Sequence, residues 1–117
     1  MKTLRDRTKA FAVRRVHAYL ALPKNEVSHI LGRQFVRSGT SVGAHCREGY
    51  RSRSNAELIS KYEAALQELD ETMYWLEVLV EAGIVKQRRV EALLQEADEI
   101  VAILVTSVKT IKRRRQR

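Results

Sequence analysis

The sequence predicts an all-α protein, an antiparallel up-down-up-down four-helix bundle formed by a single domain over residues 1–117. Only one proline and five glycines occur in a chain that is 44% hydrophobic and 31% charged, a composition that favours helices over sheets. Apolar residues recur at spacings of three and four in four stretches. The connections between these stretches are short, which favours antiparallel neighbours.

The first helix is expected over about residues 4–21 and is ended by Pro23. Its apolar line is Leu4, Phe11, Ala12, Val16, Tyr19 and Leu20. The second is expected over about 26–48, with Asn25 as its N-cap. Its apolar line is Val27, Ile30, Leu31, Phe35, Val42 and Cys46. Gly39 and Gly43 are costly inside a helix, so we expect another helix backbone to approach closely there.

The third helix is expected over about 55–82, because Ser54 and Glu57 form a capping-box pattern and Gly83 is a natural stop. Its second half is apolar over a wider arc than one packing seam requires, which predicts a subunit interface. That interface would consist of Tyr74, Trp75, Val78 and Leu79. A base-stacking platform is the alternative for the two aromatic residues. The fourth helix is expected over about 88–112, followed by a basic tail, 112–117.

Charge is distributed unevenly along the chain, whose formal net charge is +8. Residues 1–53 carry 12 Lys and Arg against 3 Asp and Glu, residues 54–108 carry 4 against 11, and residues 109–117 carry 6 against none. An up-down-up-down bundle would bring the basic segments together at one end, where they would form a basic pole. Its members would be Arg5, Arg7, Lys9, Arg47, Arg51, Arg53, Lys112, Arg113, Arg114 and Arg115.

Such a pole favours binding to the phosphate backbone of RNA or DNA, with little sequence preference because no RNA-binding module motif is present. The alternative is a solvated end that only increases solubility. Tyr50 could stack on a base within the pole or serve as a packing lid over the helix end.

Polar residues at i, i+4, i+8 and i+11 share one face of the second helix and predict a buried polar seam: Arg37, Ser41, His45 and Glu48. Arg37 could pair there with Glu48 or with an acid on a neighbouring helix. Catalysis would also need an orienting acid and an oxyanion hole, which the pattern does not supply, so we expect no catalytic residue and no enzyme activity. We also expect no metal, because no second cysteine is present and because none of Glu68, Glu71, Glu96 and Glu99 is followed three residues later by a histidine; we expect no cofactor either.

No segment approaches the roughly 20 apolar residues of a membrane span, and the first residues lack the apolar core of a signal peptide. We therefore expect no membrane association. The single cysteine, Cys46, cannot form a disulfide within the chain, so a cytoplasmic location is expected.

A motif pattern runs through the middle of the chain: Gln34, Arg37, Ser38, Ser41-Val42, Glu48-Gly49, Arg51, Ser54, then Glu68-Leu69-Asp70-Glu71-Thr72 and Tyr74-Trp75-Leu76. This pattern resembles the bacterial four-helix-bundle family of 23S rRNA intervening-sequence proteins, although His45 stands where the family usually has asparagine. Accessory variability proteins of diversity-generating retroelements look like relatives. The resemblance implies a barrel-like homopentamer that binds nucleic acid and a reverse transcriptase.

Two functions are therefore expected as alternatives. The first is a non-enzymatic, self-associating accessory protein that binds nucleic acid through the basic pole. The second is a protein-interaction scaffold for a partner such as a reverse transcriptase, with no direct role for nucleic acid.

Overall fold

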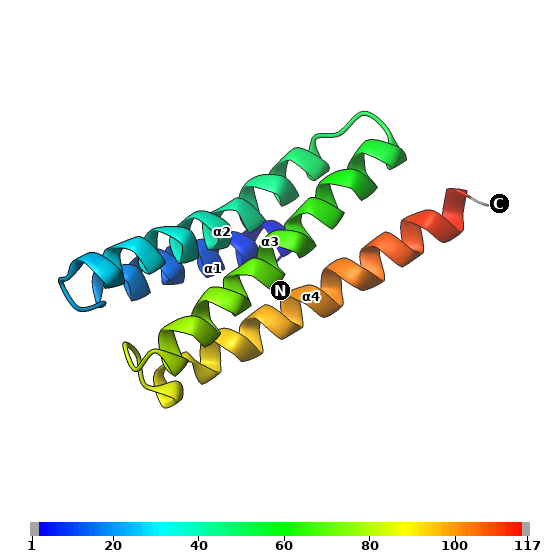
Figure 1. The fold of residues 1–117 in the computed structure, drawn as a ribbon. Helices are drawn as coiled ribbons and strands as arrows, with labels where there is room; N and C mark the ends of the chain where they lie inside the picture. The colour runs from blue at the N-terminus through cyan, green and yellow to red at the C-terminus, as the bar shows by residue number, and fades with distance from the viewer. Residues whose placement is uncertain (1–2, 116–117) are drawn as a thin grey trace.

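The computed structural model describes residues 3–115, apart from the side chain of Arg115, and consists there of four helices without a strand. Helix α1 spans Leu4–Leu20 and α2 spans Glu26–Tyr50, while α3 spans Asn55–Glu81 and α4 spans Gln87–Arg115. In Figure 1 the α1–α2 turn and the α3–α4 turn lie at one end of the molecule, and the α2–α3 turn lies at the other. Among the four pairs of neighbouring helices, α2 and α3 make the most extensive contact and α1 and α4 the least.

The helix ends follow the expected capping chemistry at most positions. The side chain of Asn25 accepts from the backbone N–H of Ser28, and that of Ser54 accepts from Glu57. The capping box at Ser54 is only half formed, because the Glu57 carboxylate accepts from the N–H of Arg53 instead. Gly83 has a φ of +76°, a left-handed conformation that glycine adopts without strain.

Two helices extend beyond their expected ends. α2 continues past Gly49, which is buried: a Cβ there would stand 2.8 Å from the Tyr62 ring. This glycine therefore serves close packing against α3. α4 continues through Arg115, so the part of the predicted tail that the structure describes, residues 112–115, is helical. The last two residues of that tail lie outside the described residues.

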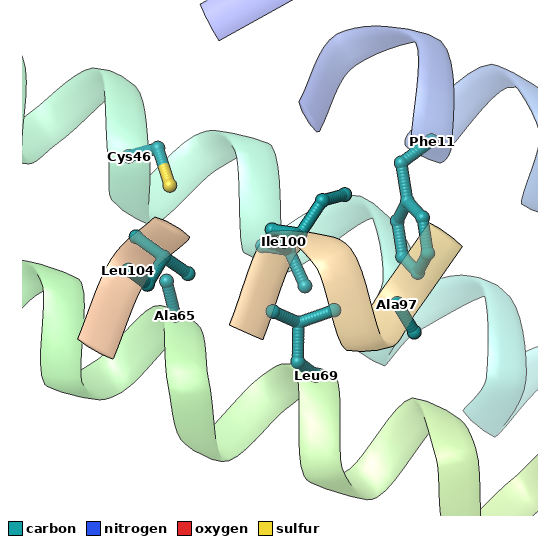
Figure 2. Close-up of a cluster of buried hydrophobic side chains, with 8 residues drawn as sticks. Phe11, Cys46, Ala65, Leu69, Ala97, Ile100 and Leu104 are labelled. Carbon is teal, nitrogen blue, oxygen red and sulfur yellow. The ribbon is translucent and has the colours of Figure 1, made fainter. Parts of the chain in front are cut away.

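Two apolar clusters form the core. The first joins all four helices and contains Phe11, Val42, Cys46, Ala65, Leu69, Ala97, Ile100 and Leu104 (Figure 2). The second lies nearer the α1–α2 and α3–α4 turns and contains Phe35, Leu76, Leu79 and Val90. Burial raises the pKa of the Cys46 thiol to about 12, so this residue behaves as a small apolar core residue at neutral pH.

The close approach of a helix backbone is confirmed at Gly43, where the backbone is that of α1, whereas Gly39 is met by the side chain of Arg15 from the same helix. A Cβ on Gly39 would stand 2.4 Å from Cγ of Arg15, and one on Gly43 would stand 3.3 Å from the carbonyl oxygen of Thr8. The two glycines therefore let α1 lie against α2, and they determine which α1 residues face inward.

The inward face of α1 differs from the predicted one. Arg15, which is absent from the predicted apolar line, is 0% exposed, whereas Val16 and Leu20 from that line are 38% and 59% exposed. On α2, Val27 and Ile30 of the predicted line are also more than half exposed. The position of Arg15 fits the absence of a side chain at Gly39, where the arginine stem is accommodated.

Candidate functional site

A groove of about 530 Å³ runs between α1 and α2 near the start of α1. Its lining contains four basic side chains, one carboxylate and a set of small residues: Arg5, Thr8, Lys9, Ala12, Thr40, Gly43, Ala44, Arg47, Glu48 and Arg51. The four basic side chains are exposed, and none of them forms an ion pair within the described part of the chain. Four uncompensated positive charges therefore surround one groove.

The groove exists because small residues line the two helices where they meet. Ala12 of α1 and Gly43 and Ala44 of α2 belong to the lining, and the hydroxyl of Thr8 donates to the carbonyl of Leu4 in its own helix. The groove thus combines small neutral residues with four basic side chains, a lining that suits a chain of phosphates.

Tyr50 lies next to this groove and is 64% exposed. The guanidinium carbon of Arg5 stands 4.3 Å from the centroid of the Tyr50 ring, a cation–π contact between the start of α1 and the end of α2. Tyr50 is thus not the packing lid considered above. Instead it is an exposed aromatic residue within a basic surface.

The structure brings only part of the predicted basic pole together. Arg7 in the first turns of α1 pairs with Glu99 of α4 at 2.7 Å, and α4 continues for 16 residues beyond Glu99, which is about 24 Å of helix. The start of α1 therefore lies beside the middle of α4 and far from its end. The short length of α1 could be predicted from the sequence, but the axial position of α1 relative to α4 could not.

The predicted pole thus divides into separate groups. Arg5, Lys9, Arg47 and Arg51 line the groove, while Arg7 is compensated by Glu99. Arg53 is exposed in the α2–α3 turn, and Lys112, Arg113 and Arg114 are exposed at the end of α4, where Lys112 lies 3.9 Å from Glu63. The side chain of Arg115 lies outside the described residues.

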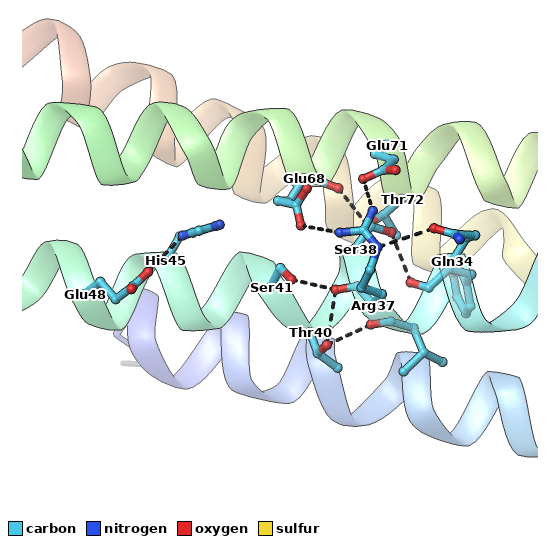
Figure 3. A network of polar contacts seen from close by, with 12 residues as sticks. Gln34, Arg37, Ser38, Thr40, Ser41, His45, Glu48, Glu68, Glu71 and Thr72 are labelled. Atoms are coloured by element: carbon cyan, nitrogen blue, oxygen red, sulfur yellow. Dashed lines mark hydrogen bonds and ion pairs between the residues drawn. The ribbon is translucent and has the colours of Figure 1, made fainter.

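The predicted polar seam is present on α2 but lies at the surface. Arg37 pairs with Glu68 at 3.3 Å and with Glu71 at 2.5 Å on α3, and its side chain is 50% exposed (Figure 3). The hydrogen bond from Arg37 is the main reason why the pKa of Glu71 lies below its ordinary value. The expectation of burial was wrong, and of the two partners considered for Arg37, Glu48 or an acid on a neighbouring helix, the structure has the second.

The other members of the seam make local contacts. The hydroxyl of Ser41 donates to the Arg37 carbonyl one turn earlier, and His45 Nδ1 lies 2.9 Å from a Glu48 oxygen. Lys61 of α3 stands 3.7 Å from the same carboxylate. The hydrogen bond from His45 lowers the pKa of Glu48. This face therefore combines local contacts within α2 with surface ion pairs from Arg37 and Glu48 to α3.

A buried polar contact between α2 and α3 is made by two residues for which no structural role was predicted. The hydroxyls of Ser38 and Thr72 are 3.0 Å apart, and both residues are 0% exposed. Both residues belong to the motif pattern that carries the family resemblance, and this pattern was the sequence feature that could have identified them. Their hydrogen bond accounts for two of the motif's small polar positions.

The predicted interface on α3 is only partly available to another subunit. Leu79 is 1% exposed and belongs to the core of a single chain, and Trp75 packs against the same cluster. Val78 is half-buried, and Tyr74 is 55% exposed. Most of the additional apolar residues in this half of α3 therefore pack within the core of the single chain. A more exposed apolar stripe lies on α1, where Val13, Val16 and Leu20 are spaced at i, i+3 and i+7.

The described residues hold no group of three or more His, Cys, Asp or Glu side chains arranged to bind a metal ion. Among the same residues, no helix is long and apolar enough to cross a membrane.

The fold and site define a class: a four-helix protein with a basic groove between its first two helices. The chain belongs to the 23S rRNA-intervening sequence protein family, because the sequence model of that family matches residues 4–106. It is also similar to a crystal structure of a protein of unknown function from the S23 ribosomal protein family of Bacteroides thetaiotaomicron. The two are 34% identical with a TM-score of 0.86, over 92% of this chain and 99% of the other. No curated protein matches the chain.

Proposed function

We propose that this protein binds the phosphate backbone of RNA or DNA in the α1–α2 groove and carries out no catalysis of its own. The observation that carries the proposal is the set of four unpaired basic side chains around one groove, with Glu48 as the single acidic lining residue. Bound phosphates would release counterions from the nucleic acid, which favours association. The exposed Tyr50 at the edge offers a surface for a base. The proposal includes a cytoplasmic location, which the single free cysteine supports.

The test is fluorescence anisotropy with a labelled single-stranded RNA over a series of salt concentrations. If all four groove charges are engaged, the logarithm of the association constant should fall by about 2.8 per tenfold increase in salt, at about 0.7 for each phosphate contact. A peptide nucleic acid of the same base sequence has no phosphates and serves as the control, which should not bind. Absence of RNA binding at 50 mM salt, or equal binding of the control, would contradict the proposal.

We further propose that copies of this up-down-up-down bundle associate, as a homopentamer, through the apolar stripe Val13, Val16 and Leu20. These side chains are 45%, 38% and 59% exposed on one face of α1, where burial against another copy would be favourable. Repetition of the groove around an axis would then add avidity for a long nucleic acid. The same stripe favours the second candidate function, docking of a protein partner such as a polymerase.

The double substitution Val16→Glu and Leu20→Glu is expected to convert the assembly to monomers without unfolding the helices, because it buries charge in the proposed contact. Light scattering measures the mass, and circular dichroism checks the fold. Ser60→Glu, at an exposed position of α3, is the control and should leave the mass unchanged. A monomeric wild-type protein at micromolar concentration would refute self-association, as would an unchanged mass in the double variant.

A further inference from the structure

A second hollow, of about 320 Å³, lies at the opposite end of the bundle from the α2–α3 turn, between the α1–α2 and α3–α4 turns (Figure 1). Its deepest lining residues are apolar and nearly inaccessible to solvent: Phe35 and Leu79 are 1% exposed, and Leu76 is 2% exposed. Leu22 and Pro23 of one turn and Ile84 and Val85 of the other complete its walls. The volume is at the lower end of the range for small-molecule sites, so any ligand is small.

The polar part of this pocket has one sign of charge. Lys86 and Arg89 are its charged lining residues, both are exposed, and no acidic residue contributes to the lining. Neither side chain forms a hydrogen bond or an ion pair within the described part of the chain. The pocket therefore combines an apolar interior with two unpaired cations at its solvent edge.

The start of α4 reinforces this asymmetry. α4 begins at Gln87, between the two cations in sequence, and has no acidic residue in its first turn. Its positive dipole end is therefore not offset by a nearby carboxylate of that turn. An anionic group at the mouth of the pocket would meet both side chains and this helix end.

We propose that this pocket binds a small amphipathic anion, a molecule with a hydrocarbon body and one carboxylate, such as a medium-chain fatty acid. The hydrocarbon body would lie against the half-buried side chains of Leu22, Ile84 and Val85, and the carboxylate would meet Lys86 and Arg89. A neutral molecule would leave both cations unpaired, and a cationic one would be repelled by them, so charge complementarity selects the anion. This site is separate from the α1–α2 groove and does not depend on nucleic-acid binding.

Isothermal titration calorimetry with three probes of equal chain length tests the charge requirement. Decanoate should bind to the full-length protein at least tenfold more tightly than decanol, and decyltrimethylammonium should bind more weakly than either, all measured below micelle formation. Lys86→Gln with Arg89→Gln should weaken decanoate at least tenfold and leave decanol within twofold. The matched control is Arg113→Gln with Arg114→Gln, which removes the same charge at the other end of α4 and should change neither affinity. Equal binding of the three probes, or equal losses in both double variants, would overturn the proposal.

The position of the ligand is tested by methyl NMR spectroscopy and by filling the pocket. Decanoate should shift the methyl signals of Ile84 and Val85 and leave those of Ile100, in the other core cluster, unchanged. Ala21→Trp places a large side chain at an exposed lining position and should abolish the binding of both decanoate and decanol while the helical signal persists. Shifts at Ile100 alone, or undiminished binding in Ala21→Trp, would contradict the assignment. If the number of decanoate molecules bound per chain falls as the protein concentration rises, another copy of the chain covers the pocket. That result would also overturn the proposal.

Discussion

Glu96→Ala is expected to lower the free energy of unfolding by about 3 kcal/mol, the lower end of the range for breaking a buried ion pair. Glu96 is the acidic partner of Arg15, whose side chain is 0% exposed and whose Nη2 lies 3.5 Å from a Glu96 oxygen. Arg14 pairs with the same carboxylate. Without Glu96, the guanidinium of Arg15 would remain buried with no counter-charge.

The environment of Arg15 explains why this loss is costly. Its guanidinium lies over the Phe11 ring at 3.8 Å, and its Nε and Nη1 have no hydrogen-bond partner within the described residues. Burial, and secondarily the charge of Arg14, lowers the pKa of Arg15 from its ordinary value to about 9. The unfolded chain therefore holds this proton more tightly than the folded one. The contribution of this group to stability increases as the pH rises from about 9 towards the ordinary pKa of arginine, and the full cost of burying the charge is present at neutral pH.

Replacing Arg15 instead of Glu96 distinguishes the free-energy cost of burying the guanidinium charge from the stabilisation that the ion pair provides. Arg15→Met keeps an unbranched side chain against Gly39 and Phe11 and removes the buried charge, while Glu96 keeps Arg14. We expect this variant to be as stable as the wild type or more stable by about 1–4 kcal/mol.

Urea denaturation measures both variants, with Glu99→Ala as the matched control on α4. Glu99 pairs with Arg7 at the surface, where the two side chains are 50% and 28% exposed, so its loss should cost less than about 1 kcal/mol. Equal costs for Glu96→Ala and Glu99→Ala would show that Arg15 does not depend on its counter-charge.

Charge reversal in the groove, Arg47→Glu with Arg51→Glu, is expected to weaken RNA binding on the order of 100-fold at low salt and to reduce the salt slope by about 1.4. Both residues are exposed, Arg47 in the last turn of α2 and Arg51 at its C-cap, so the helices should remain folded. The reversal places two negative charges beside Arg5 and Lys9 and cancels the positive potential of the groove.

Arg113→Glu with Arg114→Glu is the control for this experiment, since it changes the net charge equally at the end of α4. If RNA binds in the α1–α2 groove, this control should have only a small effect on affinity, because Arg113 and Arg114 lie on the part of α4 that extends away from the start of α1. Equal losses in the two variants would assign binding to overall charge, and a larger loss in the control would assign it to α4. Anisotropy measures both affinities, and circular dichroism checks the fold.

The number, order and approximate limits of the helices could be predicted, because they depend on local chemistry. Asn25 and Ser54 cap helices in the way their side chains favour, and Gly83 ends one by adopting a positive φ. The close approach at Gly43 was also predictable, since a glycine inside a helix is costly unless another segment uses the space. The predicted family is confirmed by the match over residues 4–106.

The candidate site was predictable in its residue types but not in its grouping. Periodicity treats every arginine of α1 as part of a polar face, so it could not distinguish the buried Arg15 from the groove residue Arg5. It also assigned Val16 and Leu20 to the core, although both are exposed. These differences depend on the rotation of α1 about its axis, which is determined by the space above Gly39.

By itself, the sequence determined the helices, their caps and the presence of basic segments, because those follow from spacings of three and four residues and from single side chains at helix ends. Only the tertiary structure decided which basic residues meet. The level of α1 along its neighbours places Arg5 over Tyr50 and Arg7 beside Glu99, and it separates the groove from the end of α4. The physical reason is that the axial position and rotation of a helix result from packing between distant residues, such as Arg15 against Gly39, which no local pattern contains.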